Sequence, residues 1–234
     1  MTRASTTLLP CVEVGPTGAV DGAVVWMHGL GASGHDFEEL VPLLRLPRVR
    51  FVFPHAPQRA VTINMGLIMP AWYDIRSLTS PREEDERGIR ESQGLIEALV
   101  TRELERGVPA ARIVLAGFSQ GGAMALFTGL RHAEALAGVM VLSGYEVLPQ
   151  TRSAELSTAN HETPLLCCHG SHDQVVPLGL ARAAFEAHAR AEREAAWHEF
   201  PMGHEVCLSE VDVVRAWLQA RFAGQGADLL SSGA

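Results

Sequence analysis

The chain has 234 residues and a net charge of −8, and all 19 of its basic residues are arginine. This length suits one α/β domain with a substantial core. The acidic balance and the lack of a basic run argue against nucleic acid as a partner. Because the chain contains no lysine, a lysine-bearing phosphate loop, a lysine Schiff base and lysine-based catalysis are all excluded.

The four cysteines do not have the spacing of a disulfide framework, and two of them, Cys167 and Cys168, are adjacent. The first residues carry one arginine and no apolar run of signal-peptide length. No apolar stretch approaches the roughly 18 residues that a membrane span needs. We therefore expect a cytoplasmic protein without stable membrane insertion. A homodimer is compatible with these features, which do not fix the oligomeric state.

Short apolar segments alternate with helical patterns along the chain, as is typical of a mostly parallel sheet covered on both faces. The predicted strands are residues 11–14, 23–27, 50–53, 112–117, 138–142, 165–169 and 196–200. Together with the helices between them, they predict an α/β fold with a mostly parallel central sheet and helices on both faces.

The helical patterns differ in how clearly they begin and end. A helix is predicted from Asp85 to Arg106, although Ser80 is an alternative cap at its start. Another covers residues 123–130, and the last carries an apolar stripe over 211–222 with Ser209 and Asp212 as a capping pair. We expect one domain over residues 1–222 and a mobile polar tail over 223–234.

A Gly-x-Ser-x-Gly motif occupies residues 117–121, directly after a predicted strand and before a predicted helix. This order is that of a nucleophile elbow, a strained turn that leaves its central serine above the edge of the sheet. Gly117 and Gly121 relieve the crowding in such a turn. The motif therefore predicts Ser119 as a nucleophile.

A serine hydroxyl needs a base that takes its proton and a third group that orients the base. Asp173 lies in a polar loop after the strand 165–169, and His204 lies in a loop after the strand 196–200. The order Ser, Asp, His is that of the α/β-hydrolase triad, and open α/β sheets carry their sites at the carboxyl ends of the strands. Glu199 and Asp212 are poorer candidates for the acid, because they fall on a predicted strand and a predicted helix.

The chain has ten histidines, and His204 is the candidate for the base among them. His204 follows the last predicted strand and a glycine, where the base of this fold is found. The other candidates have simpler interpretations: a strand end for His169, a loop neighbour of the acid for His172, a structural strand residue for His198, and surface residues for His132, His161 and His188.

The segment 28–34 follows an early strand and begins His-Gly-Leu-Gly. One oxyanion donor of this fold is the backbone N–H after the nucleophile, here Gln120, and the second comes from such a His-Gly-rich loop, here Leu30. The glycines at 29, 31 and 34 also match a dinucleotide-binding fingerprint. That alternative requires an acidic residue at the end of the next strand, and Pro-His-Ala-Pro at 54–57 contains none.

The apolar segment 62–75 lies between a strand and a helix. Its residues alone leave two interpretations open: a hairpin buried in the core, or a cap that lines an acyl-binding groove beside Ser119. The candidate groove residues are Leu67, Ile68, Met69 and Trp72, with Val176 and Leu178 as the opposite wall.

These motifs together resemble the carboxylesterase/phospholipase family of α/β-hydrolases, which includes acyl-protein thioesterases and bacterial carboxylesterases. The matching segments run from about residue 23 to about residue 222: 28–31 with 36–37, 54–57, 62–66, 69–74, 117–122, 169–177 and 203–205. The resemblance implies a serine hydrolase of small or lipid-like esters or thioesters with short-to-medium acyl chains, working without a cofactor. It implies the same triad and oxyanion donors, and it favours the groove interpretation of 62–75.

Two alternatives remain open, a lysophospholipase-type hydrolase of the same fold and a non-catalytic binding module on a hydrolase scaffold. The physiological substrate and the preference for esters or thioesters are not fixed by these motifs. No metal site is expected, because Cys167, Cys168 and His169 are consecutive on a strand and cannot converge on one ion.

Overall fold

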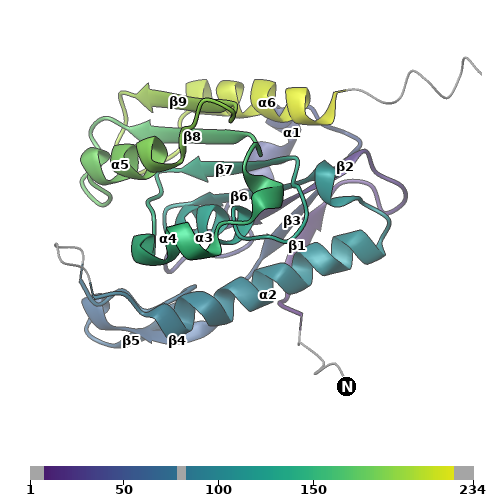
Figure 1. Cartoon of the computed structure of the whole chain (residues 1–234). Coiled ribbons are helices and arrows are strands. Elements are labelled where there is room, and N and C mark those ends of the chain that lie inside the picture. Colours follow the sequence, from purple (N-terminus) through teal and green to yellow (C-terminus); the bar gives the residue numbers. More distant parts are fainter. Residues whose placement is uncertain (1–7, 78–82, 224–234) are drawn as a thin grey trace, which may run out of the picture.

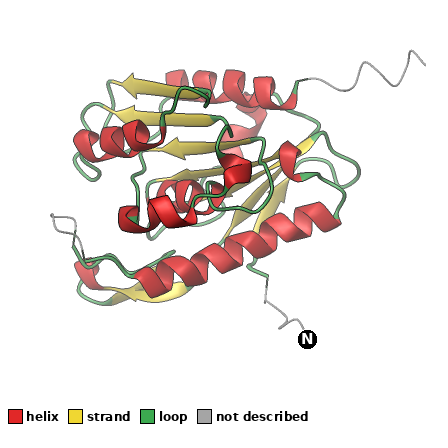
Figure 2. Ribbon diagram, in the orientation of Figure 1, coloured by secondary structure: helices red, strands yellow, loops and turns green. Residues whose placement is uncertain are grey.

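A seven-stranded sheet runs through the middle of the molecule, and helices flank it (Figures 1 and 2). The structure is a computed structural model that describes residues 8–77 and 83–223. The strand order is β1-β3-β2-β6-β7-β8-β9, and every neighbouring pair is parallel except β1 with β3. The strands are β1 Cys11–Val14, β2 Gly22–Met27, β3 Val49–Pro54, β6 Ile113–Phe118, β7 Gly138–Leu142, β8 Leu165–Gly170 and β9 Ala195–Phe200. Each predicted strand is present within one residue of its predicted ends.

The helices cover both faces of this sheet, as predicted. One face carries α2 (Glu86–Glu105), α3 (Gln120–Gly129) and α5 (Leu178–His188), and the other carries α1 (Val41–Leu44) and α6 (Leu208–Phe222). The short helix α4 spans Arg152–Glu155. The 3-10 turns are η1 Glu38–Leu40, η2 Thr62–Asn64, η3 Ala110–Arg112, η4 Pro149–Thr151 and η5 Thr158–Asn160.

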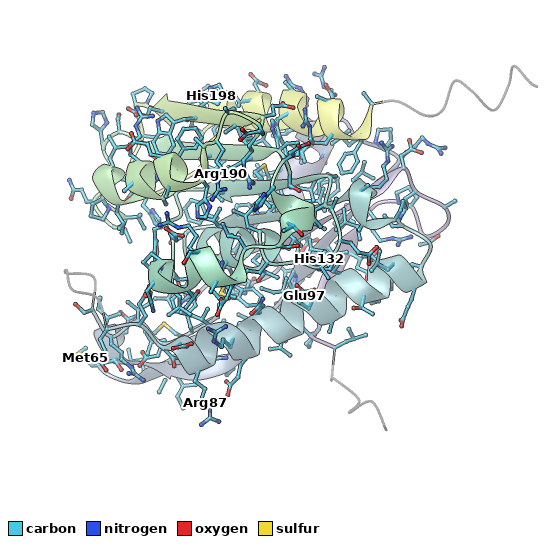
Figure 3. The ribbon with its side chains drawn as sticks, viewed as in Figure 1. Met65, Arg87, Glu97, His132, Arg190 and His198 are labelled. Atoms are coloured by element: carbon cyan, nitrogen blue, oxygen red, sulfur yellow. The ribbon has the colours of Figure 1, made fainter. Side chains whose placement is uncertain are left out.

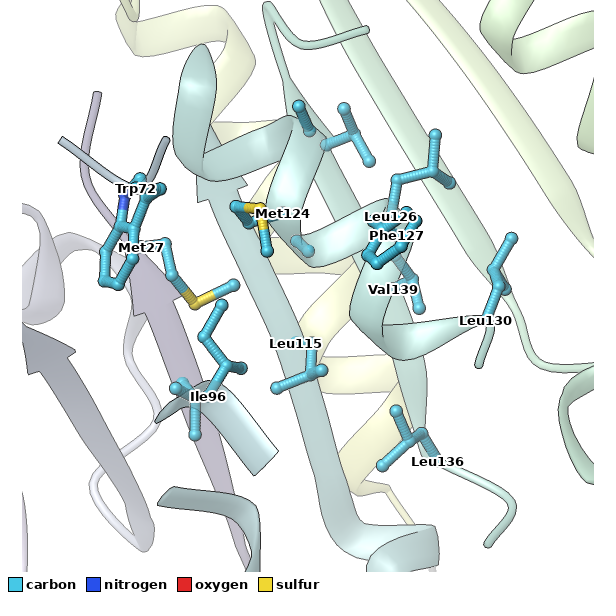
Figure 4. Packing of buried hydrophobic residues seen from close by; sticks show 14 of the residues in the cluster. Met27, Trp72, Ile96, Leu115, Met124, Leu126, Phe127, Leu130, Leu136 and Val139 are labelled. Atoms are coloured by element: carbon cyan, nitrogen blue, oxygen red, sulfur yellow. The ribbon is translucent and has the colours of Figure 1, made fainter. Parts of the chain in front are cut away.

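The sheet separates two apolar cores, and β2 contributes to both. Val25 and Met27 pack in the core under α2 and α3, whereas Val24 and Trp26 pack in the core under α1 and α6. Successive residues of a strand point to opposite faces, so a strand covered on both sides must be apolar throughout. Figure 4 shows the first core, where Met27 lies beside Trp72 and Ile96. Each large side chain buried there stabilises the fold by roughly 1.5–3 kcal/mol.

The two long helices begin differently from one another. Asp85 caps α2, where its carboxylate accepts a hydrogen bond from the Gly88 N–H at 3.1 Å, so the predicted start is confirmed. The alternative cap Ser80 lies outside the described residues. The predicted Ser209–Asp212 capping pair of α6 is wrong, because that helix begins earlier, with Cys207 as its N-cap residue and no side-chain cap. Ser209 is the second residue of the helix.

Two histidines that we predicted at the surface are buried. His188 is 1% exposed and its Nε2 lies 2.9 Å from Glu146 Oε1; His132 is 6% exposed and its Nδ1 lies 2.7 Å from Glu97 Oε2. Figure 3 shows His132 above α2, which carries Glu97. A hydrogen bond to a carboxylate offsets the free-energy cost of burying an imidazole. The sequence pattern does not show which carboxylate provides that bond.

Segment 62–75 does contain a hairpin, but it projects from the sheet and is only partly buried. β4 (Gln58–Val61) and β5 (Leu67–Pro70) pair antiparallel outside the main sheet, and Met65 at the tip is 92% exposed (Figure 3). The Thr62 N–H and hydroxyl both donate to the Asp74 carboxylate at 2.7 Å. The Asp74 N–H in turn donates to Asp85 at the start of α2, so the hairpin is fixed to that helix.

Of the predicted tail 223–234, only Ala223 lies within the described residues. No helix among the described residues is long and apolar enough to cross a membrane.

Candidate active site

Ser119 stands in a tight turn between β6 and α3. Its backbone has φ 54° and ψ −119°, a region that L-residues rarely adopt, and its side chain is only slightly exposed. A Cβ on Gly117 would lie 2.2 Å from the backbone of Gly121, and a Cβ on Gly121 would lie 2.3 Å from the Met27 carbonyl oxygen. Both glycines are therefore required by close approach of the backbone, as predicted for a nucleophile elbow.

The structure brings Ser119, Asp173 and His204 together at the carboxyl ends of β6, β8 and β9. The His204 Nδ1 lies 2.7 Å from Asp173 Oδ2, and its Nε2 lies 2.8 Å from Ser119 Oγ. Because a carboxylate only accepts hydrogen bonds, Nδ1 carries the proton and donates to Asp173. Nε2 is then the acceptor for the Ser119 hydroxyl. This is the arrangement in which a histidine can take the proton of a serine.

Asp173 is held in place by its own loop. Its side chain is fully buried, and Oδ1 accepts hydrogen bonds from the N–H groups of Val175 and Val176 at 2.8 and 2.9 Å. His169 lies beside it, with Nε2 at 2.9 Å from the Val176 carbonyl oxygen. Burial lowers the pKa of His169, so this imidazole stays neutral near pH 7. The negative charge of Asp173 therefore faces His204 without a competing imidazolium.

The predicted oxyanion donors border the nucleophile. Gln120 is the first residue of α3, and a Cβ added at Gly29 would lie 3.5 Å from Ser119 Cβ, which places the loop before Leu30 against the nucleophile. Among the described residues, neither the Leu30 N–H nor the Gln120 N–H has a hydrogen-bond acceptor within the protein. Two such N–H groups next to a nucleophilic oxygen can stabilise the charge of a tetrahedral intermediate.

A buried histidine shapes the loop that carries Leu30. The His28 Nδ1–H donates to the Gly29 carbonyl oxygen at 2.6 Å, and its Nε2 accepts from the Ala56 N–H at 3.0 Å. Since one ring nitrogen donates and the other accepts, the imidazole is neutral. Burial lowers the pKa of His28, which favours the same state.

Trp72 connects both parts of the predicted oxyanion site. Its indole N–H donates to the His28 carbonyl oxygen at 2.9 Å, and its backbone N–H donates to the Gln120 side-chain oxygen at 2.8 Å. The Gln120 amide nitrogen donates to the Tyr73 carbonyl oxygen at 2.8 Å, and the Ser92 hydroxyl donates to the Trp72 carbonyl oxygen. These bonds fix the loop after β2 and the start of α3 relative to each other.

A cavity of about 490 Å³ opens beside Ser119 and His204. Its walls are mainly apolar, with two carboxylates at the cavity: Gly29, Leu30, Ala32, Asp36, Phe37, Leu40, Phe118, Ser119, Val175, His204, Glu205 and Val206. None of the six predicted groove residues belongs to this lining. Trp72 is buried in the core at 0% exposure, which fits the core interpretation for that residue, and Val176, predicted as the opposite wall, is also a core residue at 3% exposure.

The remaining groove candidates lie outside this lining as well. Leu67 and Ile68 are exposed on β5, and Leu178 is half-buried at the start of α5. Met69 is near the oxyanion loop, because its sulfur would lie 3.7 Å from a Cβ on Gly31. The Gly31 N–H also donates to the Pro70 carbonyl oxygen at 2.8 Å.

The apolar walls of the cavity were not predicted from the sequence. Phe118 lies within the predicted elbow and Val206 lies two residues after His204, so chain proximity alone could have identified them. Phe37 and Leu40 could not be found this way, because they lie at the two ends of η1, far along the chain from Ser119 and His204.

Within residues 8–77 and 83–223, no three His, Cys, Asp or Glu side chains are grouped so that they could hold a metal ion. Burial raises the pKa of the Cys167 and Cys168 thiols far above the usual range, which disfavours the thiolate form that a metal requires.

The sequence and the fold are both similar to those of known proteins. The sequence profile of the phospholipase/carboxylesterase family matches residues 12–221. Acyl-protein thioesterase 1 of Yarrowia lipolytica is 36% identical over 218 residues, covering 90% of this chain and 96% of that protein. Acyl-protein thioesterase 1 of Neurospora crassa is 39% identical over 211 residues, covering 85% and 86%. The crystal structure of Zea mays acyl-protein thioesterase 2 has a TM-score of 0.81 at 28% identity, covering 91% of this chain and 99% of that one.

The predicted α/β-hydrolase fold is confirmed by these matches, which cover nearly the whole described chain. A profile match over most of the chain and relatives above one-third identity agree with the geometry at Ser119. The chain therefore belongs to the phospholipase/carboxylesterase family of α/β-hydrolases.

Proposed function

We propose that this chain hydrolyses carboxylic esters or thioesters of short-to-medium acyl chains through an acyl-enzyme on Ser119. The observation that carries the proposal is the position of His204, which lies within hydrogen-bond distance of both Ser119 Oγ and Asp173 Oδ2. The test is turnover of butanoyl esters and thioesters by the purified chain.

The geometry supports a defined sequence of steps. His204 Nε2 takes the proton of the Ser119 hydroxyl as its oxygen attacks the acyl carbonyl carbon. The N–H groups of Leu30 and Gln120 bind the oxyanion, and Asp173 stabilises the imidazolium. The proton on Nε2 then passes to the leaving alcohol or thiol as the bond to it breaks. Water, deprotonated by the same nitrogen, attacks the acyl carbon; as the bond to Ser119 Oγ breaks, Nε2 returns the proton to that oxygen, and the acid and the free Ser119 hydroxyl are released.

We place the acyl chain on the side of the hairpin. Its strand β5 reaches the oxyanion loop through the bond between Gly31 and Pro70, and Met69 covers Gly31. Side chains of a strand alternate between its two faces, so Leu67 shares the face of Met69 whereas Ile68 points to the other. The groove proposal therefore keeps Leu67 and Met69 and no longer includes Ile68.

We expect kcat/KM to rise severalfold per two-carbon extension from acetyl to butanoyl to hexanoyl esters, because each buried methylene contributes about 0.8 kcal/mol. Leu67→Asp places a charge in the groove and should penalise hexanoyl esters much more than acetyl esters. Ile68→Asp, with the same change on the opposite face, is the matched control and should leave the ratio unchanged. A uniform loss for all esters with a lower melting temperature in Leu67→Asp would contradict the groove.

Activity is expected to survive exhaustive chelation and dialysis. The steps above use side chains and backbone N–H groups of this chain alone, and its described histidines and cysteines form no metal cluster. The measurement compares initial rates before and after treatment with a strong chelator. Loss of turnover that one added metal restores would overturn this account.

A lysophospholipase of the same fold is the second candidate, since it would use the same three residues. A panel with lysophospholipids beside simple esters and thioesters distinguishes the two. The proposal has four further parts: one domain over residues 1–222, a tail over 223–234, a cytoplasmic location and a homodimer. Fractionation tests the location, and sedimentation tests the assembly.

A further inference from the structure

The residues on the two sides of Ser119 pack in different cores of the protein. Phe37 is part of the core under α1 and α6, and Leu40, Phe118 and Val206 pack against that core. Trp72, at the base of the hairpin, belongs to the core under α2 and α3. The apolar walls of the cavity of about 490 Å³ therefore pack with one core, and the base of the hairpin packs in the other. A substrate bound across Ser119 has one part on each side.

The position of His204 decides which part lies in the cavity. In the proposed mechanism its Nε2 gives a proton to the leaving oxygen or sulfur, so the leaving group must lie against this imidazole. His204 and the two residues after it form one wall of the cavity, and the Phe118 ring lies next to the imidazole with centroids 4.8 Å apart. When the leaving oxygen or sulfur lies beside Nε2, the rest of the leaving group extends into this cavity.

The cavity has a distinct chemical character. Its inner walls are the side chains of Leu30, Phe37, Leu40, Phe118 and Val206, which favour an apolar stem. Asp36 and Glu205 add two carboxylates at exposed positions, and His204 is the only residue of the lining that can carry a positive charge. The Asp36 carboxylate is fixed by the Ser33 N–H and hydroxyl at 3.1 and 2.9 Å.

We propose that this cavity binds the leaving-group half of the substrate and selects alcohols or thiols with an apolar stem and a neutral or cationic end. Anionic leaving groups meet Asp36 and Glu205 and are disfavoured. The inference rests on the proposed function, because it assigns a substrate class to the same site.

A charge series tests the selection. We choose three butanoyl thioesters: that of thiocholine, that of its neutral carbon analogue 3,3-dimethylbutane-1-thiol, and that of 3-mercaptopropionate. All three form the same butanoyl-enzyme, but their thiols differ in intrinsic leaving ability, so each kcat/KM is divided by the rate constant for spontaneous alkaline hydrolysis of the same thioester. The normalised values then differ through the contacts that the thiol part makes with the protein. We expect the thiocholine ester to exceed the mercaptopropionate ester about tenfold at low ionic strength, with a smaller ratio in high salt.

Two charge-reversal variants locate the effect. Glu205→Arg should bring the ratio of cationic to anionic substrate to one or below. Glu162→Arg makes the same change at an exposed position before β8, at the opposite edge of the sheet from the site, and should leave the ratio as in the unmodified protein. β8 separates the two edges by roughly 20 Å, more than a Debye length.

A size series tests the assignment of the two sides. With butanoyl fixed, methyl, butyl and hexyl esters should show rising kcat/KM until the cavity is filled. Leu40→Phe narrows the cavity and should move this limit to shorter alcohols without changing the order of the acyl series. Leu67→Asp should change the acyl series and not the alcohol series.

Equal turnover of the three thioesters, or a Glu205→Arg ratio that matches that of Glu162→Arg, would overturn the charge selection. A Leu40→Phe variant that alters the acyl series in place of the alcohol series would overturn the assignment of the sides. If none of the esters or thioesters is hydrolysed, the proposed function itself fails.

Discussion

Ser119→Ala and His204→Ala are each expected to lower kcat by a factor on the order of 10⁴–10⁶ while the fold stays intact. In the proposed mechanism Ser119 supplies the attacking oxygen, and His204, whose Nε2 lies 2.8 Å from that oxygen, is the base. Because both residues act in the same step, the double variant should be hardly slower than either single one. Turnover of a butanoyl ester measures the loss, and the melting temperature confirms the fold.

Asp173→Asn tests the third residue, because the amide can no longer fix His204 with Nδ1 protonated. A loss on the order of 10⁴ is expected. His172→Ala is a suitable control, since this exposed neighbour of Asp173 bonds to the rest of the chain only through its backbone N–H among the described contacts. Near-normal turnover of Asp173→Asn would show that the acid is wrongly assigned.

The second large effect concerns stability and the carboxyl group of Glu210. This side chain is fully buried at the third position of α6, and neither of its oxygens has a hydrogen-bond partner within the described structure. Burial raises the pKa of Glu210 to about 8. The folded protein therefore keeps this proton where the unfolded chain, with an ordinary carboxyl pKa near 4.5, has lost it.

The sign of the pH dependence follows from this difference. Between pH 4.5 and about 8 the folded state binds more protons at Glu210 than the unfolded state does, so the contribution of this group to stability falls as the pH rises. The contribution is constant below the unfolded pKa and constant again above the folded one. Its full range is at most about 5 kcal/mol, from 1.36 kcal/mol per pKa unit.

Glu210→Gln removes the charge and keeps the shape of the side chain. The difference in free energy of unfolding between this variant and the unmodified protein should therefore grow in favour of the variant from pH 5 to pH 8. Asp212→Asn, on the same helix but with an exposed side chain, should show no such trend. The measurement is urea unfolding at several pH values. Parallel stability curves for Glu210→Gln and the unmodified protein would contradict the account.

The elements of the sheet were predictable because most of the parallel strands are continuous apolar runs between polar segments. Ser119, Asp173 and His204 were predictable because each follows a predicted strand in the order of the fold, and the structure places them together. Local patterns determine these features, so one sequence was enough to predict them.

Other features depend on contacts between distant segments and could not be predicted in this way. His188 is buried because Glu146 lies beside it, 42 positions away along the chain, and no periodic pattern marks that pair. The cap of α6 was misplaced because Ser209 looks like a cap residue, although the helix begins at Leu208. The face of the hairpin that meets the site depends on how β5 docks on the loop after β2, which only the structure provides.

The most direct test of the central claim is reaction with a fluorophosphonate, which labels a serine only where a base has activated it. We expect one adduct per chain, mapped by peptide mass spectrometry to Ser119, and a strongly reduced labelling rate in His204→Ala. An unlabelled folded protein, or an adduct on another serine with Ser119 unmodified, would contradict the assignment of Ser119 as the nucleophile.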